Sequence, residues 1–285
     1  MPKCHRSAIP TIIRRPVLER RQRPEHMMHF ITSSPLWVQT ILILILPTIA
    51  SMLGPLLVRR FVRLEKLATN NEVAGFKFAT VGVLYAVLLA FSIVVVWEKF
   101  NDAEATVQRE AAAAATIYHL VPGLAPAQAK DARDALTTYL KSIVTDEWPA
   151  MEDGRANQQT WKALGAIYTA LLATDATAKG DPTVKAEIFN QLNLITQARR
   201  TRLLAAEGDV PGPVWFILFG GAFLTVVFTF FFGTQNLRAQ TLMTGLLTLL
   251  IFSELLIAVA LDRPFTGGIK ESPDAIVRVL ADFAP

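Results

Sequence analysis

The chain has 285 residues, of which 52% are hydrophobic and only 18% are charged. Because soluble domains usually carry about 25% charged residues, this composition favours a membrane protein over a soluble globular one. The formal net charge of +4 is small, and the single cysteine, Cys4, excludes both a disulfide framework and a cysteine-based metal site.

The first 35 residues form a basic leader that we expect to lack regular structure. Seven of the 28 Lys and Arg residues lie before residue 30, and such a segment could contact nucleic acid or anionic lipid. No groove of interleaved basic and aromatic residues accompanies it, so we expect no nucleic-acid partner. The four histidines do not fall at metal-ligand spacing, so we also expect no metal site and no cofactor.

Four apolar runs are long enough to cross a lipid bilayer, which takes about 20 residues. These runs are Leu36–Val58, Phe78–Trp97, Val214–Phe232 and Thr241–Leu261. Helices of a soluble core would show a polar face, and the second and third runs show almost none. We therefore expect a multi-pass membrane protein, with transmembrane helices 1 and 2 in residues 36–97 and helices 3 and 4 in residues 214–261.

Residues 98–213, between the second and third spans, predict a helical extramembrane domain. The helix of the second span continues from Trp97 to about His119 without Pro or Gly. Three further helices are expected, at about 127–147, at about 159–173 and from Asp181 to near Gly208, and Pro149 is expected to end the first of these three. The tail, 262–285, begins irregularly and closes with a short amphipathic helix. The predicted fold class is therefore all-α.

The positive-inside rule leaves open which side of the membrane the domain faces. The short loops on the side opposite the domain carry six basic residues, and the tail on the domain side carries three. Counting the seven basic residues of the leader raises the domain side to ten and places the domain in the cytoplasm. If translation starts at Met27 or Met28, the count stays at three and the domain faces outward.

The sequence contains no motif of a known enzyme class, and we do not expect an enzyme. The most informative single residue is Glu254, which lies well inside the fourth apolar run. A carboxylate at the centre of a span costs about 2.5–3.5 kcal/mol, so it should face protein or water. Two interpretations stay open: an ion or proton site, or a protonated Glu hydrogen-bonded to Ser or Thr of a neighbouring span.

A stripe of small residues follows one face of the second span. Gly82, Ala86 and Ala90 are spaced four residues apart, which lets another helix approach closely. We expect this face to serve helix packing, either within the subunit or between subunits of a homo-oligomer.

Acidic residues follow the point where the second span leaves the membrane. They are Glu98, Asp102, Glu104 and Glu110, and the last turns of the fourth domain helix carry Arg199, Arg200 and Arg202. If the two helices pack antiparallel, the outer acids and the arginines lie at similar heights. We favour exposed structural ion pairs, worth ~0.2–1 kcal/mol each. The alternative is that acids of several subunits form a cation-attracting ring at a pore mouth.

Four blocks of sequence, in this order, resemble one family. They are "GVLYAVLLAFSIVVVWEKFNDAEATVQREAAAAATIYHL", "EWPAM", "RRTRLLAAEGDVPGPVWFILFGGAFLTVVFTFFFG" and "LDRPFTGG". Together they are similar to the bacterial bestrophin-like membrane proteins, a domain family of unknown function. The resemblance covers roughly residues 28–275 and implies a bacterial inner-membrane protein.

The chain is distantly similar to bestrophins, which are pentameric, calcium-activated anion channels whose second span lines an apolar neck. The shared layout of spans implies a cytoplasmic domain and an oligomer, with Phe91, Ile93 and Val95 near a constriction. The acidic calcium clasp of animal bestrophins is missing, since only Asp262 precedes Arg263 and Pro264. The leading expectation is an oligomeric channel that passes inorganic ions. The alternative is a non-conducting membrane scaffold or sensor whose helical domain binds a partner.

Overall fold

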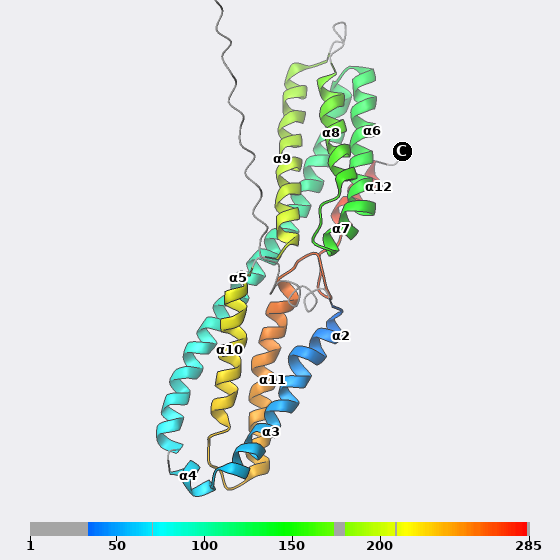
Figure 1. The fold of residues 1–285 in the computed structure, drawn as a ribbon. Coiled ribbons are helices and arrows are strands. Elements are labelled where there is room, and N and C mark those ends of the chain that lie inside the picture. The colour runs from blue at the N-terminus through cyan, green and yellow to red at the C-terminus, as the bar shows by residue number, and fades with distance from the viewer. Residues whose placement is uncertain (1–33, 70, 174–179, 209, 284–285) are drawn as a thin grey trace, which may run out of the picture.

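The computed structural model describes residues 34–69, 71–173, 180–208 and 210–283. Every regular element in these ranges is a helix, which confirms the predicted all-α class. Long apolar helices occupy one end of the elongated molecule and a helical domain occupies the other (Figure 1). The basic leader expected over residues 1–35 lies outside the described residues, apart from its last two.

Within the described residues, four helical rods are long and apolar enough to cross a membrane, as the sequence predicts. The first consists of α2 (Leu36–Gln39), a π-helical stretch η1 (Thr40–Ile45) and α3 (Leu46–Phe61). A short helix, α4 (Leu64–Ala68), precedes the second rod. The other three rods are α5 (Asn71–Leu120), α10 (Gly212–Thr229) and α11 (Leu237–Leu261).

The spans pack through small residues that let helix backbones approach each other. A Cβ atom on Gly221 of α10 would lie 2.7 Å from the ring of Tyr85 on α5. The Tyr85 hydroxyl donates a hydrogen bond to the Leu218 carbonyl oxygen at 3.0 Å, which ties the same two helices together. Leu89 and Leu255 are buried in the apolar cluster beside this contact.

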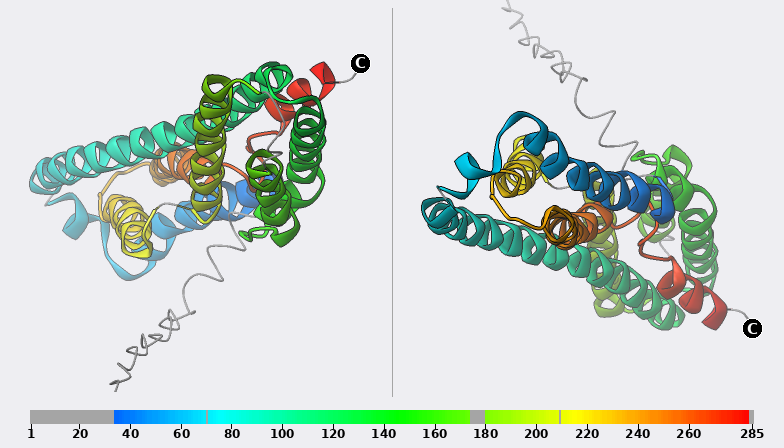
Figure 2. Two further views of the ribbon diagram at one scale, coloured as in Figure 1. Left: turned by 90° about the horizontal axis from the view of Figure 1, so that it is seen from above. Right: turned by 90° about the horizontal axis from the view of Figure 1, so that it is seen from below.

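Helix α5 is the element that the two ends of the molecule share. Its 50 residues correspond to a length of about 75 Å at 1.5 Å per residue. In Figure 1 it runs from the far end of the spans into the domain, and both views of Figure 2 show it along the whole molecule. The predicted unbroken exit from the membrane at Trp97 is therefore present, and the helix ends one residue after His119.

The domain is built from four further helices around α5. They are α6 (Pro126–Ser142), α7 (Trp148–Glu152), α8 (Gln158–Leu172) and α9 (Pro182–Ala206). Helix α9 runs back toward the spans alongside α5 (Figure 1). The Asp181 side chain caps α9 by accepting a hydrogen bond from the Thr183 amide at 2.8 Å, as the Asp-Pro pair predicts.

The prediction that Pro149 ends the first of the domain helices after α5 is wrong. The chain passes from α6 through a π-helical turn, η3 (Ile143–Glu147), directly into α7, and Pro149 is the second residue of α7. A π turn shifts the backbone hydrogen bonds by one residue. Pro149, which has no backbone N–H, therefore lies where the regular series of α-helical hydrogen bonds is already interrupted. The helix can continue through it for this reason.

The C-terminal tail returns to the domain after the last span. Helix α12 (Asp274–Asp282) packs on α5 and α6, as the predicted amphipathic helix would. The Tyr118 and Phe283 rings stack with their centroids 3.8 Å apart. Upstream in the tail, Phe265 is fully buried and makes an edge contact with Trp148.

Candidate functional site

The small-residue stripe on α5 lies on a face that the rest of the subunit leaves uncovered. Tyr85 and Leu89 turn inward and are 8% and 1% exposed, whereas Ala86 and Ala90 are exposed. A Cβ atom on Gly82 would meet no atom within 4 Å. This face is therefore open to a helix from outside the subunit.

Phe91 and Ile93, which the resemblance implies near one constriction, lie on different sides of α5. The Phe91 side chain is 67% exposed, about 100° around α5 from the stripe residue Ala90. Ile93 is partly buried and packs against the inner cluster that contains Trp215 and Leu218. Of the two, only Phe91 is directed away from the subunit.

The Glu254 side chain is half-buried and lies in the second half of helix α11. Within the described ranges, its carboxylate makes no hydrogen bond to a Ser or Thr of a neighbouring span and no ion pair. This arrangement leaves the carboxylate oxygens free to accept a proton or a hydrogen bond from water.

The four acids after the membrane exit have different surroundings. Glu98 and Asp102 are exposed, and Glu104 is half-buried and accepts a hydrogen bond from the Gln108 amide at 3.1 Å. Glu110 is 0% exposed and lies nearly two turns further into the domain. Only the first two therefore lie at the surface close to the membrane exit.

Glu110 and Arg202 form the centre of a buried ionic network. Arg202 Nε donates to Glu110 Oε2 at 2.8 Å, and Arg202 Nη2 donates to Glu147 Oε2 at 2.9 Å. Arg199 Nε donates to the same Glu147 oxygen at 3.1 Å. The Tyr139 hydroxyl donates to Glu110 Oε1 at 2.6 Å. Two guanidinium groups thus neutralise two carboxylates in the interior of the domain.

The network links four elements. Glu110 comes from α5, Tyr139 from α6, Glu147 from the π turn η3, and both arginines from α9. Arg202, Glu110 and Glu147 are completely buried. Because a buried charge needs both a partner and hydrogen bonds, this network fixes how α5, η3 and α9 lie relative to one another.

Electrostatics keep Arg202 charged and Tyr139 protonated. Burial acts to lower the pKa of Arg202, but the Glu110 and Glu147 carboxylates outweigh burial and raise the pKa, so the guanidinium stays protonated. Burial, assisted by the Glu110 charge, raises the pKa of Tyr139 well above its ordinary value, so its hydroxyl remains a donor. The network therefore has a fixed pattern of donors and acceptors.

The structure brings together part of the predicted set of acids and arginines. Arg202 forms an ion pair with Glu110, as predicted for this set. Arg199 instead forms an ion pair with Glu147, and Arg200 is exposed. In the described ranges Glu104 bonds to none of the three arginines. The pairs are also buried rather than exposed, which makes them costly to break instead of nearly neutral.

Sequence reasoning missed Glu147, although a signal for it exists. Tyr139 and Ile143 lie on the predicted apolar stripe of the α6 region, and Glu147 follows at the same four-residue spacing. A carboxylate that continues an apolar stripe points into the core and therefore requires a cationic partner.

Comparisons with known proteins agree with this architecture. A family model described as a Bestrophin-like domain matches residues 45–276. The fold is similar to a bacterial Bestrophin homolog from Klebsiella pneumoniae solved by Zn-SAD phasing, with a TM-score of 0.64 and 14% identity over 84% of this chain and 97% of that chain. A point mutant of a homolog from the same organism has a TM-score of 0.66 and 14% identity, over 85% of this chain and 99% of that one. No curated protein sequence matches.

Proposed function

The chain belongs to the bestrophin-like family, and on that premise we propose that it assembles as a homo-oligomeric ion channel or pore in the bacterial inner membrane. The observation that carries this proposal is the uncovered apolar face of α5. Gly82, Ala86 and Ala90 allow close approach of a helix from another copy. Phe91 is also exposed, and it follows Ala90 by about 100° around the helix axis.

In such an assembly, α5 helices from several copies surround a common axis. Phe91 then narrows the path within the membrane, as a hydrophobic constriction does in other channels. The exposed acids Glu98 and Asp102 lie just beyond Trp97. Repeated around the axis, they would form a ring that attracts cations. Glu110 does not contribute to this ring, because Arg202 neutralises it.

Current across planar bilayers containing the purified protein tests the proposal. Phe91→Ala is expected to raise the conductance because it removes a ring from the constriction, and Glu254→Gln is expected to alter the current because it removes an intramembrane ionisable group. Phe223→Ala, on the 63%-exposed Phe223 of α10, is the matched control and should conduct like the parent protein. Well-folded protein that passes no current would contradict the proposal.

We further propose that the domain lies in the cytoplasm, as the resemblance to bestrophins implies. A reporter fused to the C-terminus tests this, because the tail helix α12 packs on the domain and shares its side of the membrane. Fusions that start at Met1 and at Met28 separate the contribution of the leader. Reporter activity outside the cytoplasm in the Met1 fusion would contradict the assignment.

The rival function is a non-conducting membrane scaffold or sensor, and one observation favours it. The α5 segment from Val81 to Trp97 carries no charged side chain and only one hydroxyl on its exposed or half-exposed positions, Ser92, which bonds to the Leu88 carbonyl oxygen. A path lined only by such residues offers little to a hydrated ion. Folded, monomeric protein without current would support the scaffold.

A further inference from the structure

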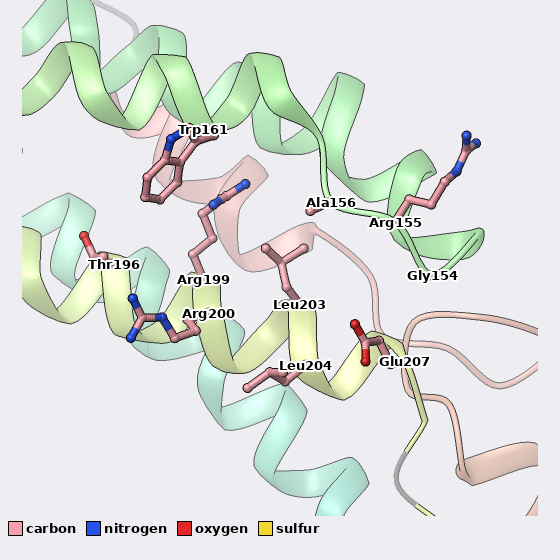
Figure 3. Close-up of a pocket in the computed structure, with 10 residues that line it drawn as sticks. All are labelled: Gly154, Arg155, Ala156, Trp161, Thr196, Arg199, Arg200, Leu203, Leu204 and Glu207. Atoms are coloured by element: carbon pink, nitrogen blue, oxygen red, sulfur yellow. The ribbon is translucent and has the colours of Figure 1, made fainter. Parts of the chain in front are cut away.

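A cavity of about 250 Å³ opens in the domain beside the ionic network. It lies between the first turns of α8, the last turns of α9 and the loop at 154–156 that precedes α8 (Figure 3). Trp161 forms one wall, and Leu203 and Leu204 form the apolar part of the other. The cationic residues of the lining are Arg199, Arg200 and Arg155, the last of which pairs with Asp153. The cavity is separate from the α5 face.

Arg199 reaches this cavity with part of its donor capacity unused. Its side chain is 7% exposed, and its Nε and Nη2 atoms donate to Glu147 and to the Asn157 carbonyl oxygen. Its Nη1 atom donates to no acceptor in the parts of the chain that the structure describes. Nη1 is not enclosed by protein atoms, so it is open to the cavity and can donate to water or to an acceptor bound there.

The walls of the cavity fit a flat apolar body. The Trp161 indole is 56% exposed, which is unusual for so large an aromatic group outside the membrane spans, and Leu204 is 61% exposed. The Arg199 Cζ atom lies 5.4 Å from the Trp161 ring centroid, so the guanidinium and the indole are adjacent. An aromatic ring placed against Trp161 would cover exposed apolar surface while its substituent approaches Arg199.

The arrangement of charged side chains around Arg199 favours an anionic ligand in the cavity. The compensating carboxylate, Glu147, is 0% exposed and lies behind Arg199, so the cavity is lined by the guanidinium and not by its partner acid. Arg200 is exposed at the rim, and Glu207 is the acid that lines the cavity. The cavity volume of about 250 Å³ lies below the range of roughly 300–1,000 Å³ that ligand pockets usually span, and therefore limits the ligand to about one ring.

We propose that this cavity binds a small aromatic monocarboxylate, with its ring against Trp161 and its carboxylate bonded to Arg199 Nη1 and Arg200. The assignment does not depend on ion conduction, and it can hold or fail whichever function the spans perform. A chain of ion pairs runs from Arg199 to Glu147, from Glu147 to Arg202 and from Arg202 to Glu110 on α5. An occupied cavity is therefore connected to α5 through the ionic network.

Binding of 4-fluorobenzoate to the purified full-length protein in detergent, followed by ¹⁹F NMR line broadening, tests the assignment. Two matched probes separate the parts of the ligand: 4-fluorobenzyl alcohol lacks the charge, and fluoroacetate lacks the ring. We expect 4-fluorobenzoate to bind at least about tenfold more tightly than either probe, since a charge-assisted hydrogen bond and a ring contact are each worth about that factor.

Trp161→Ala and Arg200→Gln should each weaken 4-fluorobenzoate binding by about tenfold or more. Both side chains are exposed, so the variants should keep the fold, which size-exclusion elution verifies. Arg278→Gln, at an exposed arginine of α12, is the control and should bind like the parent. Absence of 4-fluorobenzoate binding, equal binding of the uncharged alcohol, or binding unchanged by both variants would overturn the assignment.

Discussion

Arg202 is completely buried between two carboxylates, so its removal would leave Glu110 and Glu147 with a single guanidinium. We expect Arg202→Met to destabilise the protein by about 3–5 kcal/mol, the usual cost of breaking a buried ion pair from one side. Arg200→Met, two residues earlier and exposed, should change stability by less than about 0.5 kcal/mol. Thermal unfolding of both variants in the same detergent measures the difference, and equal melting temperatures would refute a central role for the network.

Glu271, in the tail between the last span and α12, gives a pH-dependent contribution to stability. Burial raises its pKa, and the Glu104 and Asp274 carboxylates raise it further. A carboxyl whose pKa is higher in the folded state stabilises that state below its unfolded pKa, and this stabilisation is lost as the pH rises through the folded value.

Glu271→Gln should therefore raise the melting temperature at pH 7 and leave it nearly unchanged at pH 4. The gain should stay below about 1 kcal/mol, because solvent screens a partly exposed carboxylate. Melting curves of parent and variant between pH 4 and pH 7 provide the measurement. A difference that is constant over this range would contradict the assignment to Glu271.

At the scale of the helices, two adjacent glycines of α10 have opposite roles. A Cβ atom on Gly221 would lie 2.7 Å from the Tyr85 ring, and one on Gly220 would meet nothing within 4 Å. The Tyr85 hydroxyl is bonded to the Leu218 carbonyl oxygen, so the ring cannot move aside without losing a hydrogen bond.

Gly221→Ala should consequently cost about 1–3 kcal/mol through overpacking. Gly220→Ala should be neutral or stabilise by up to about 1 kcal/mol, because alanine loses less backbone entropy in a helix. Melting temperatures of the two purified variants compare them directly. If both variants melt alike, the α5–α10 contact is looser than the structure shows.

The helices were predictable from the sequence because their signals are local. Apolar runs give the spans, the Asp181–Pro182 pair gives the start of α9, and the absence of Pro and Gly after Gly82 gives the unbroken α5. The π turn that accommodates Pro149 was not predictable, since it depends on packing of η3 against the rest of the domain. The partner of Arg199 was missed for a similar reason: Glu147 is more than fifty residues away in sequence, and only the fold brings the two together.

For the whole molecule, the proposed oligomer predicts proximity between copies along the small-residue stripe. In a Cys4→Ser background, Ala86→Cys should form disulfide-linked dimers on mild oxidation in membranes, because the exposed stripes of two copies would be adjacent. Ala222→Cys, at a 0%-exposed position of α10, is the control and should remain monomeric on a non-reducing gel. Equal cross-linking of the two variants would contradict an interface along α5.

The length of α5 has a mechanical consequence. Trp97 divides the helix into arms of similar length, about 39 Å toward Asn71 and about 35 Å toward Leu120. If this rod tilts about Trp97, its two ends move by nearly equal amounts in opposite directions. Phe91, only about 9 Å from that pivot, moves about a quarter as far as the domain end. Such a lever converts a broad swing of the domain into a fine adjustment at Phe91.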